Sequence, residues 1–225
     1  MIIVTGASKG LGEAIAKHLF ENGEEVVGLS RSRGELNINF IECDVGDYQS
    51  VKIASREIKK MKKPIKAVIN AAGIASMNMA VTTDNSTVQK LIKTNLIGTI
   101  NICQLFAPIM LRVRNGSFIN FSTIAVHLAL KGESVYAASK AGVETFSRTF
   151  AREMADFNVR VNCIAPGPIK TDLLRGISDS QIKKITDQQV IPRLFQKSDI
   201  CNLVDLLLDE KSSSLSGQIF NVGGI

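Results

Sequence analysis

The sequence predicts a doubly wound α/β fold, a parallel sheet of about seven strands with helices on both faces. Three observations predict it. Short apolar runs alternate from end to end with stretches of helical length. A glycine-rich loop separates the first run from the first helix. The 225 residues are 45% hydrophobic and 21% charged, without a break in composition, so we expect a single domain over residues 1–225.

The expected strands are short and mostly apolar, as is typical of strands buried on both faces of a parallel sheet. They lie at residues 2–4, 26–29, 40–41, 67–69, 117–121, 159–164 and 218–222. Longer stretches between them space their apolar residues as a helix does. These stretches predict helices at residues 11–21, 49–62, 86–113, 134–157 and 198–208.

Composition and charge argue against several classes of protein. No apolar run reaches the ~18 residues of a membrane span, so we expect no membrane association. The net charge is +6, but the basic run at residues 59–63 has no aromatic company, and we expect a solvated helix end rather than a nucleic-acid site. The four cysteines form no CxxC pair, so we expect no metal site. Reduced thiols and an N-terminus unlike a signal peptide predict a cytoplasmic protein.

The loop at residues 5–12, which reads TGASKGLG, predicts a site for a pyrophosphate. Glycines there allow a tight turn, a close approach of the backbone to a ligand, and packing of the helix on the sheet. The helix N-terminus then presents unpaired N–H groups and the positive end of its dipole. We therefore expect cofactor contacts from Gly6, Ser8, Lys9, Gly10, Leu11 and Gly12.

Five ordered motifs resemble the short-chain dehydrogenase/reductase family over nearly the whole chain. They are the TGxxxGxG loop, NAAG at residues 70–73, Asn95 in a long helix, YAASK at residues 136–140 and APGPIKT at residues 165–171. The resemblance implies a Rossmann-type fold. It also implies an oxidoreductase that moves a hydride between nicotinamide C4 and a carbonyl or secondary alcohol, similar to the 3-oxoacyl-[acyl-carrier-protein] reductases.

Tyr136 and Lys140 are four residues apart on a predicted helix and therefore share one face. A nearby ammonium lowers the pKa of a phenol from about 10, so Tyr136 is expected to act as general acid or base. The resemblance implies that a hydroxyl after the fifth strand binds the substrate carbonyl. Thr123 fits by register, and Ser122, one residue earlier, is the alternative. Asn95 is implied to hold a water of a proton relay through Lys140.

The end of the second strand predicts the choice of cofactor. Folds that bind NAD often carry an acid there, which binds the ribose 2′-hydroxyl. In this sequence Ser30 and Arg31 take that place, and Lys9 adds a second cation. A hydroxyl and a guanidinium suit a 2′-phosphate, so we predict NADP(H) in preference to NAD(H).

Further cofactor contacts are implied by the resemblance alone. Asp44 and Val45 are expected at the adenine. The path of the ribose and pyrophosphate is expected to run along Asn70, Ala71, Ala72 and Gly73. The nicotinamide end is expected beside Tyr136, Lys140, Pro166, Gly167, Ile169 and Thr171.

The substrate stays open at this point. The first expectation is a 3-oxoacyl thioester carried on an acyl carrier protein. The alternatives are a sugar or another small ketone, or a regulatory or scaffold protein that binds NADP without catalysis. Residues 172–193 mix apolar and polar side chains, which predicts a lid over the substrate.

Two further features concern the assembly and the adenine end. The helices around Asn95 and Tyr136 carry apolar residues beyond a single stripe, which predicts a homodimer or homotetramer. The stretch between Arg31 and Asp44 is short, so we expect a loop at residues 32–40 instead of a helix. Such a loop would leave the adenine end of the site less covered.

Overall fold

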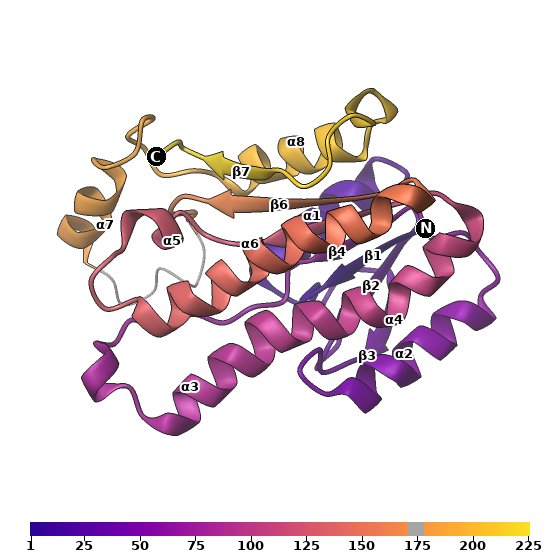
Figure 1. The fold of residues 1–225 in the computed structure, drawn as a ribbon, viewed down its shortest axis with the longest axis horizontal. Helices are drawn as coiled ribbons and strands as arrows, with labels where there is room; N and C mark the ends of the chain where they lie inside the picture. Colours follow the sequence, from indigo (N-terminus) through magenta and orange to yellow (C-terminus); the bar gives the residue numbers. More distant parts are fainter. Residues whose placement is uncertain (171–177) are drawn as a thin grey trace.

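A computed structural model of the protein describes residues 1–170 and 178–225. Its seven strands pair in parallel in the order β3-β2-β1-β4-β5-β6-β7, as the ribbon shows (Figure 1). The predicted fold class is therefore confirmed. The strands are β1 (Ile2–Thr5), β2 (Val26–Ser30), β3 (Asn39–Glu42), β4 (Ala67–Asn70), β5 (Gly116–Phe121), β6 (Val159–Pro166) and β7 (Ile219–Val222).

Helices cover both faces of the sheet. One face carries α1 (Gly10–Glu21) and α8 (Lys197–Leu208), and the other carries α2 (Tyr48–Lys60), α4 (Gly98–Val113) and α6 (Ser134–Met154). Four further helical segments complete the described chain around the site. They are α3 (Asn85–Leu91), the π-helical η2 (Ile92–Ile97), α5 (Ala125–Leu128) and α7 (Asp179–Thr186), with short 3₁₀ turns at η1 (Ala80–Thr82), η3 (Ala155–Phe157) and η5 (Glu210–Ser212).

The two faces have separate hydrophobic cores because successive side chains of a strand point to opposite sides. In β1, Ile2 and Val4 pack with α1 and α8, whereas Ile3 packs with α2, α4 and α6. All three side chains are fully buried. Burial on both faces explains why the strands read as continuous apolar runs rather than as an alternating pattern.

The long helical stretch α3–η2–α4 divides its apolar residues between core and surface. Ile102 and Phe106 are fully buried against the sheet, whereas Ile97 is 43% exposed. The second apolar face predicted here is therefore smaller than expected, because part of it is core. By length and composition Asn85–Val113 is also apolar enough to cross a membrane, but a buried core helix of a globular domain passes the same test.

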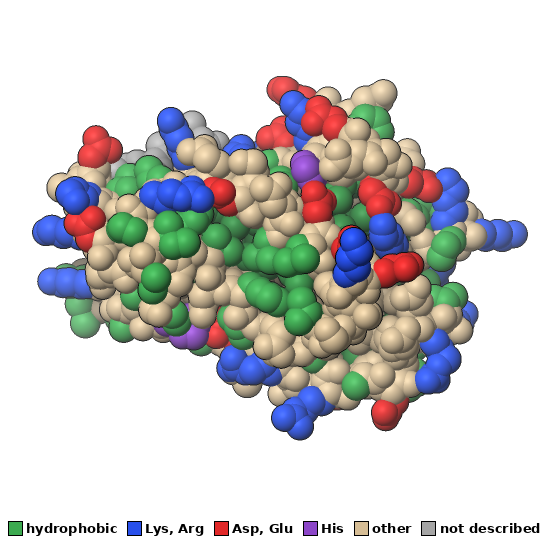
Figure 2. Space-filling model, turned by 90° about the horizontal axis from the view of Figure 1, so that it is seen from above, with side chains coloured by type: hydrophobic (Ala, Val, Ile, Leu, Met, Phe, Trp, Pro, Cys, Tyr) green, Lys and Arg blue, Asp and Glu red, His purple; other side chains and the backbone are tan. Residues whose placement is uncertain are grey.

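The surface formed around α8 and β7 combines charges of both signs with apolar side chains. Figure 2 shows Lys and Arg interspersed with Asp and Glu around a central group of hydrophobic side chains. The strand β7, at the margin of the sheet, is only half-buried along its length. This face is therefore mixed in character, with charged side chains surrounding apolar ones.

The carboxyl ends of the central strands meet at one edge of the sheet. In the register of the sheet, Thr5 of β1 lies beside Asn70 of β4, and Asn70 lies beside Asn120 of β5. The strand order reverses between β1 and β4, which is where open α/β sheets bind their ligands. The loops after these strands carry most of the motifs found in the sequence.

Residues 31–38, between β2 and β3, contain no helix, as expected. One residue of the connection, Gly34, packs closely on the glycine-rich loop. A Cβ on Gly34 would lie 2.9 Å from the Cα of Ser8 and 2.9 Å from Cζ of Phe40. The connection therefore lies directly against the glycine-rich loop at Gly34, while residues 31–33 and 35 around it are exposed.

Candidate active site

A cleft of about 1010 Å³ lies at the carboxyl edge of the sheet. Most of the predicted site residues line it, although they come from seven separate segments of the chain. From the first two strands these are Gly6, Ser8, Lys9, Gly10, Leu11, Gly12, Ser30 and Arg31. From the later segments they are Asp44, Val45, Ala71, Ala72, Gly73, Ser122, Thr123, Tyr136, Lys140, Pro166, Gly167 and Ile169. Thr171 lies outside the described residues.

Close backbone packing shapes the glycine-rich loop. Gly6 has φ of +68°, and a Cβ there would lie 2.9 Å from the Cα of Ala72. A Cβ on Gly12 would collide with the carbonyl oxygen of Gly6. The Thr5 hydroxyl also accepts a hydrogen bond from the Ala72 N–H at 3.0 Å. The loop is thus held against the segment after β4, and larger side chains at these two glycines do not fit.

The first turn of α1 faces this cleft without a cap. Lys9 is extended at the N-cap position and makes no side-chain capping bond with the described residues. Side chains do cap α2 and α3, through Asp47 and Asp84. The leading N–H groups of a helix have no partner inside it, and they bind anions well. The uncapped turn and the glycine cradle therefore fit the pyrophosphate of a dinucleotide.

At the adenine end, β2 closes with a hydroxyl instead of a carboxylate. Ser30 is buried and donates a hydrogen bond to the Ser32 carbonyl oxygen at 2.7 Å, which holds the turn. Arg31 and Lys9 are exposed and line the cleft, and Arg33 lines it as well. Arg33 was not predicted as a site residue. The signal that could have identified it is the shortness of the connection between β2 and β3, which keeps Arg33 close to Arg31 at the cleft.

Two residues of the next loop complete this end of the cleft. The Asp44 carboxylate accepts a hydrogen bond from the Gly46 N–H at 2.9 Å, and its own N–H donates to the Ser50 hydroxyl at 3.0 Å. Val45 packs so closely against α4 that a Cβ on Gly98 would lie 2.7 Å from its Cγ2. The loop that carries Asp44 is therefore fixed from both sides.

At the other end of the cleft, α6 contributes the buried Lys140 and the half-buried Tyr136. Lys140 is 6% exposed and donates a hydrogen bond from Nζ to the Phe121 carbonyl oxygen at 2.8 Å. Burial lowers the pKa of Lys140 to about 8, because an ammonium is poorly solvated there. The pKa of Tyr136 is raised by burial and by the negative charge of Glu133, while a hydrogen bond with the Thr123 hydroxyl lowers it.

The expected lowering of the Tyr136 pKa by Lys140 is therefore wrong for the protein without its cofactor. Burial disfavours the phenolate, and the acidic neighbour Glu133 adds to that effect. Sequence reasoning missed Glu133 because a lone acid at a helix start resembles an ordinary N-terminal residue. Here Glu133 lies at the N-cap position of α6 and lines the cleft.

The two candidate hydroxyls after β5 have different partners. Ser122 is 4% exposed, and its Oγ donates a hydrogen bond to Glu144 Oε1 at 2.7 Å. Thr123 is half-buried, its Oγ1 accepts from the Ala125 N–H at 3.2 Å, and its hydroxyl reaches Tyr136. The geometry therefore favours Thr123 over Ser122 as the hydroxyl that faces a substrate.

Two predicted residues lie behind the cleft wall instead of on it. The Asn70 side chain turns across the sheet and donates to Asn120 Oδ1 at 2.8 Å, so the expectation that it lines the cofactor path is not met. The Asn95 side chain accepts from the Ile74 N–H and donates to the Ile74 carbonyl, both at 2.9 Å, and donates to the Ser139 Oγ at 3.0 Å. Asn95 thus joins the wall segments together.

Part of the predicted lid lies outside the described residues, namely residues 172–177. The following helix α7 contributes Gln181 and Ile185 to the cleft. A capping box at Ser178 and Gln181 begins this helix. Other lining residues were also missed by sequence reasoning because they carry no motif. They are Leu29, Ser32, Cys43, Ile74, Ala75, Ser76, Met77, Thr94, Phe121, Ile124, Ala125, Leu130 and Pro168.

Comparison with known proteins agrees with this fold and cleft. The family model described as short chain dehydrogenase matches residues 1–182. The chain therefore belongs to the short-chain dehydrogenase family and is an oxidoreductase of a family that uses NAD(P)(H).

The relatives that resemble this chain differ from one another in the activity their names give. The chain is 32% identical to the 3-oxoacyl-[acyl-carrier-protein] reductase FabG of Staphylococcus aureus, over 99% of this chain and 96% of that protein. It is 30% identical to carbonyl reductase family member 4 of Xenopus laevis, over 98% and 95% of the two chains. The ligand-free aldohexose dehydrogenase of Thermoplasma acidophilum superposes with a TM-score of 0.89 at 29% identity, over 99% and 92% of the two chains.

We predict that Gly6→Ala disrupts nucleotide binding whereas Gly23→Ala does not. Both glycines have positive φ, +68° and +83°, so both changes incur the same backbone strain of roughly 1–2 kcal/mol. A Cβ at Gly6 also meets the Ala72 backbone, whereas nothing lies within 4 Å of one at Gly23. Fluorescence titration with NADPH, alongside urea unfolding, measures both effects. Equal affinities in the two variants would contradict the role of this packing.

Proposed function

We propose that the protein is an NADPH-dependent reductase that converts a ketone into a secondary alcohol. The observation that carries the proposal is the meeting of the Thr123 and Tyr136 hydroxyls in the cleft, above the buried Lys140. Two neighbouring hydroxyl donors that line one cleft suit a carbonyl oxygen on which negative charge develops. When bound, the cofactor supplies the hydride that reduces the carbonyl carbon.

The pKa of Tyr136 favours the reductive direction. Because burial and Glu133 raise this pKa, the side chain is a neutral phenol at pH 7 and holds the proton that an alkoxide needs. Lys140, whose pKa is lowered to about 8, lies on the same face of α6 and can return a proton near neutral pH. The Thr123 hydroxyl binds the same oxygen and orients the carbonyl.

The arrangement of cations supports NADPH over NADH. Lys9, Arg31 and Arg33 line the adenine end of the cleft, and the strand that precedes Arg31 ends in the hydroxyl of Ser30. A carboxylate at this place would repel a phosphate, whereas guanidinium groups bind one through charge-assisted hydrogen bonds. Ser30 contributes mainly by its lack of charge, because its hydrogen is already donated to Ser32.

The substrate end of the cleft supports a 3-oxoacyl thioester as the first candidate. Apolar side chains, which suit an acyl chain, make up much of its lining: Ile74, Met77, Ile124, Leu130 and Ile185. The similarity to FabG points in the same direction. An acyl carrier protein is an acidic partner in this proposal, and the net charge of +6 is compatible with it.

A sugar is the second candidate, and three polar residues favour it. Ser76, Glu133 and Gln181 line the same end of the cleft and can hydrogen-bond several hydroxyl groups. The similarity to an aldohexose dehydrogenase supports this reading. Rates with acetoacetyl-coenzyme A and with a set of aldohexoses, each with NADPH and NADH, would separate the two substrates.

We also propose that the protein forms a homodimer or homotetramer. Ile97 is 43% exposed in the helical stretch beside the site, and Leu206 of α8 is 52% exposed. Apolar side chains that lie exposed on two helices gain stability when a second copy covers them. Sedimentation or light scattering measures the assembly directly.

Tyr136→Phe is expected to lower kcat for ketone reduction by about 10²- to 10⁴-fold, because the ring remains and the proton donor is lost. The affinity for NADPH should stay within about twofold, since the ring still fills the same place in the cleft wall. Tyr48→Phe is the matched control, because Tyr48 is 39% exposed on α2 and does not line the cleft. A Tyr136→Phe protein with the activity of the Tyr48→Phe protein would exclude the proposed chemistry.

The rate should also depend on pH through Lys140. Its lowered pKa means that the ammonium loses its proton near pH 8, below its ordinary range, while Tyr136 remains a phenol. We expect kcat/KM for the ketone to fall as the pH rises through about 8. Lys140→Arg should abolish this fall of kcat/KM at high pH, because arginine keeps its proton in this pH range. A wild-type profile that stays flat to pH 10 would show that Lys140 is not involved.

Arg31→Gln is expected to weaken NADPH binding about 10- to 100-fold and to leave NADH binding unchanged, since it removes a hydrogen bond to a charged group. Arg152→Gln is the control, because Arg152 is an exposed arginine of α6 that does not line the cleft. Equilibrium titration of both variants with NADPH and with NADH gives the four dissociation constants. If Arg31→Gln weakens NADH and NADPH equally, the 2′-phosphate is not its partner.

A further inference from the structure

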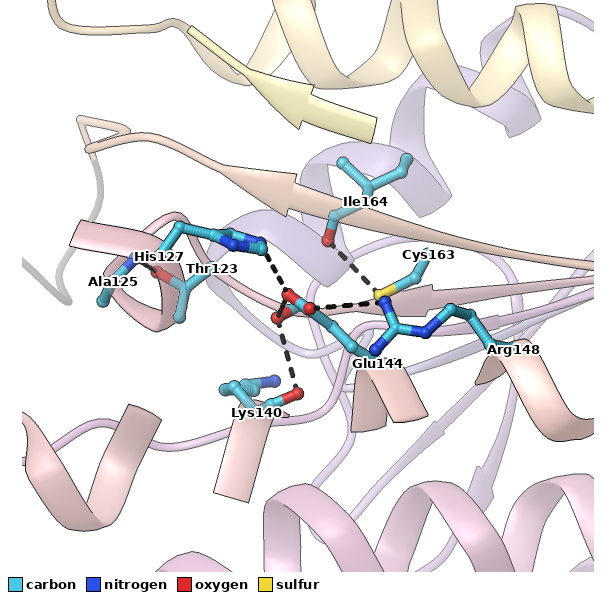
Figure 3. A network of polar contacts seen from close by, with 9 residues as sticks. Thr123, Ala125, His127, Lys140, Glu144, Arg148, Cys163 and Ile164 are labelled. Atoms are coloured by element: carbon cyan, nitrogen blue, oxygen red, sulfur yellow. Dashed lines mark hydrogen bonds and ion pairs between the residues drawn. The ribbon is translucent and has the colours of Figure 1, made fainter. Parts of the chain in front are cut away.

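A buried carboxylate lies one helical turn beyond Lys140 on α6. The side chain of Glu144 is 3% exposed, although carboxylates are rarely buried unless they are paired. Figure 3 shows it between His127, which approaches from α5, and Arg148, which follows it on α6. The proposed chemistry assigns no role to this group, so its place beside the site calls for a separate explanation.

One oxygen of Glu144 holds two residues of the turn after β5. Oε1 accepts a hydrogen bond from the Ser122 hydroxyl at 2.7 Å. The same oxygen lies 3.4 Å from Nε2 of His127, whose side chain is 32% exposed. The other oxygen, Oε2, lies 3.9 Å from the Arg148 guanidinium, on the side toward solvent. The strongest contacts of the carboxylate therefore go to the turn.

The two residues held by Glu144 flank Thr123 in the chain. Ser122 comes directly before Thr123, and its N–H donates to the Ile164 carbonyl oxygen at 2.7 Å. His127 follows four residues after Thr123, in the short helix α5. Between these two anchors the Thr123 hydroxyl points toward Tyr136 instead of following Ser122 into the interior.

We propose that Glu144 is a positioning residue, which holds Ser122 and His127 so that the Thr123 hydroxyl faces the substrate oxygen. This proposal rests on the proposed function of Thr123. The carboxylate also binds the competing hydroxyl, since a Ser122 Oγ that donates to Glu144 has no hydrogen left for a substrate. One buried acid thus selects which of two adjacent hydroxyls serves the reaction.

Kinetics of a double-mutant cycle test the proposal. Thr123→Ala should lower kcat about 100-fold or more, as loss of an oxyanion donor does. Glu144→Leu, which keeps the volume and removes the acceptor, should lower kcat about 10-fold, with KM for NADPH nearly unchanged. The double variant should be no slower than Thr123→Ala, because Glu144 acts through Thr123. If the kcat losses of the two single variants multiply in the double variant, Glu144 acts independently of Thr123, and the proposal is overturned.

A second measurement does not depend on activity. Amide hydrogen exchange in residues 122–128 should be faster in Glu144→Leu and in His127→Ala than in the wild type. His127 is partly exposed, so its variant should fold even where Glu144→Leu does not. Unchanged exchange in His127→Ala and in Ser122→Ala would overturn the proposal. If exchange changes but Thr123→Ala is fully active, Glu144 does hold the turn and the proposed role of Thr123 fails instead.

Arg148→Gln is the matched control for both measurements. Arg148 contacts the same carboxylate, but from the solvent side, and its own side chain is 51% exposed. It makes no contact with Ser122 or His127 among the described residues. We expect its kcat, and the exchange of residues 122–128, to match the wild type. If Arg148→Gln loses as much kcat as Glu144→Leu, the charge balance of α6 controls the rate, and the contacts of Glu144 with the turn do not.

Discussion

The buried side-chain amide of Asn95 connects three parts of the molecule that together form the cleft. Its hydrogen bonds reach both backbone groups of Ile74, in the loop after β4, and the hydroxyl of Ser139 on α6. Asn95 itself lies in a π-helical turn, an irregularity that helices show frequently at functional sites. A second polar link runs from the NAAG segment to α4, since the Asn70 side chain donates to Cys103 Sγ at 3.5 Å. The positions of Gly73 and Lys140 relative to each other therefore depend on a residue that does not line the cleft.

Burial determines how the groups on α6 behave. The same removal from water lowers the pKa of Lys140 and raises that of Tyr136, so both side chains favour their neutral forms. Burial thus moves the two pKa values apart, and a phenol beside an amine is favoured over a phenolate beside an ammonium. Glu144, on the same helix, stays buried because it has three polar partners. The buried acid on α6 is therefore compensated by a hydrogen bond and two ion-pair contacts.

The fold could be predicted because each strand is buried on both faces and reads as an apolar run, and the motif spacings identified most of the cleft. What sequence could not give was the direction of individual side chains. Asn70 and Asn95 were identified, but they turn to partners that lie 50 and 21 residues away in the chain. Glu144 had no motif to mark it, since its contact with Ser122 spans 22 residues. The short helices α5 and α7 have too few turns to show a periodic pattern.

The connection between β2 and β3 has a consequence for how this protein could diversify. Its residues 31–33 and 35 are exposed, yet Gly34 anchors the backbone against the glycine-rich loop. Substitutions at exposed positions seldom alter folding free energy by more than about 0.5 kcal/mol. In the proposed function, nucleotide preference therefore depends on a few surface residues that can change without disturbing the core. Lys140, which is 6% exposed, has no such freedom, so this architecture tolerates changes at the nucleotide end of the cleft more readily than changes at the proposed proton-transfer groups.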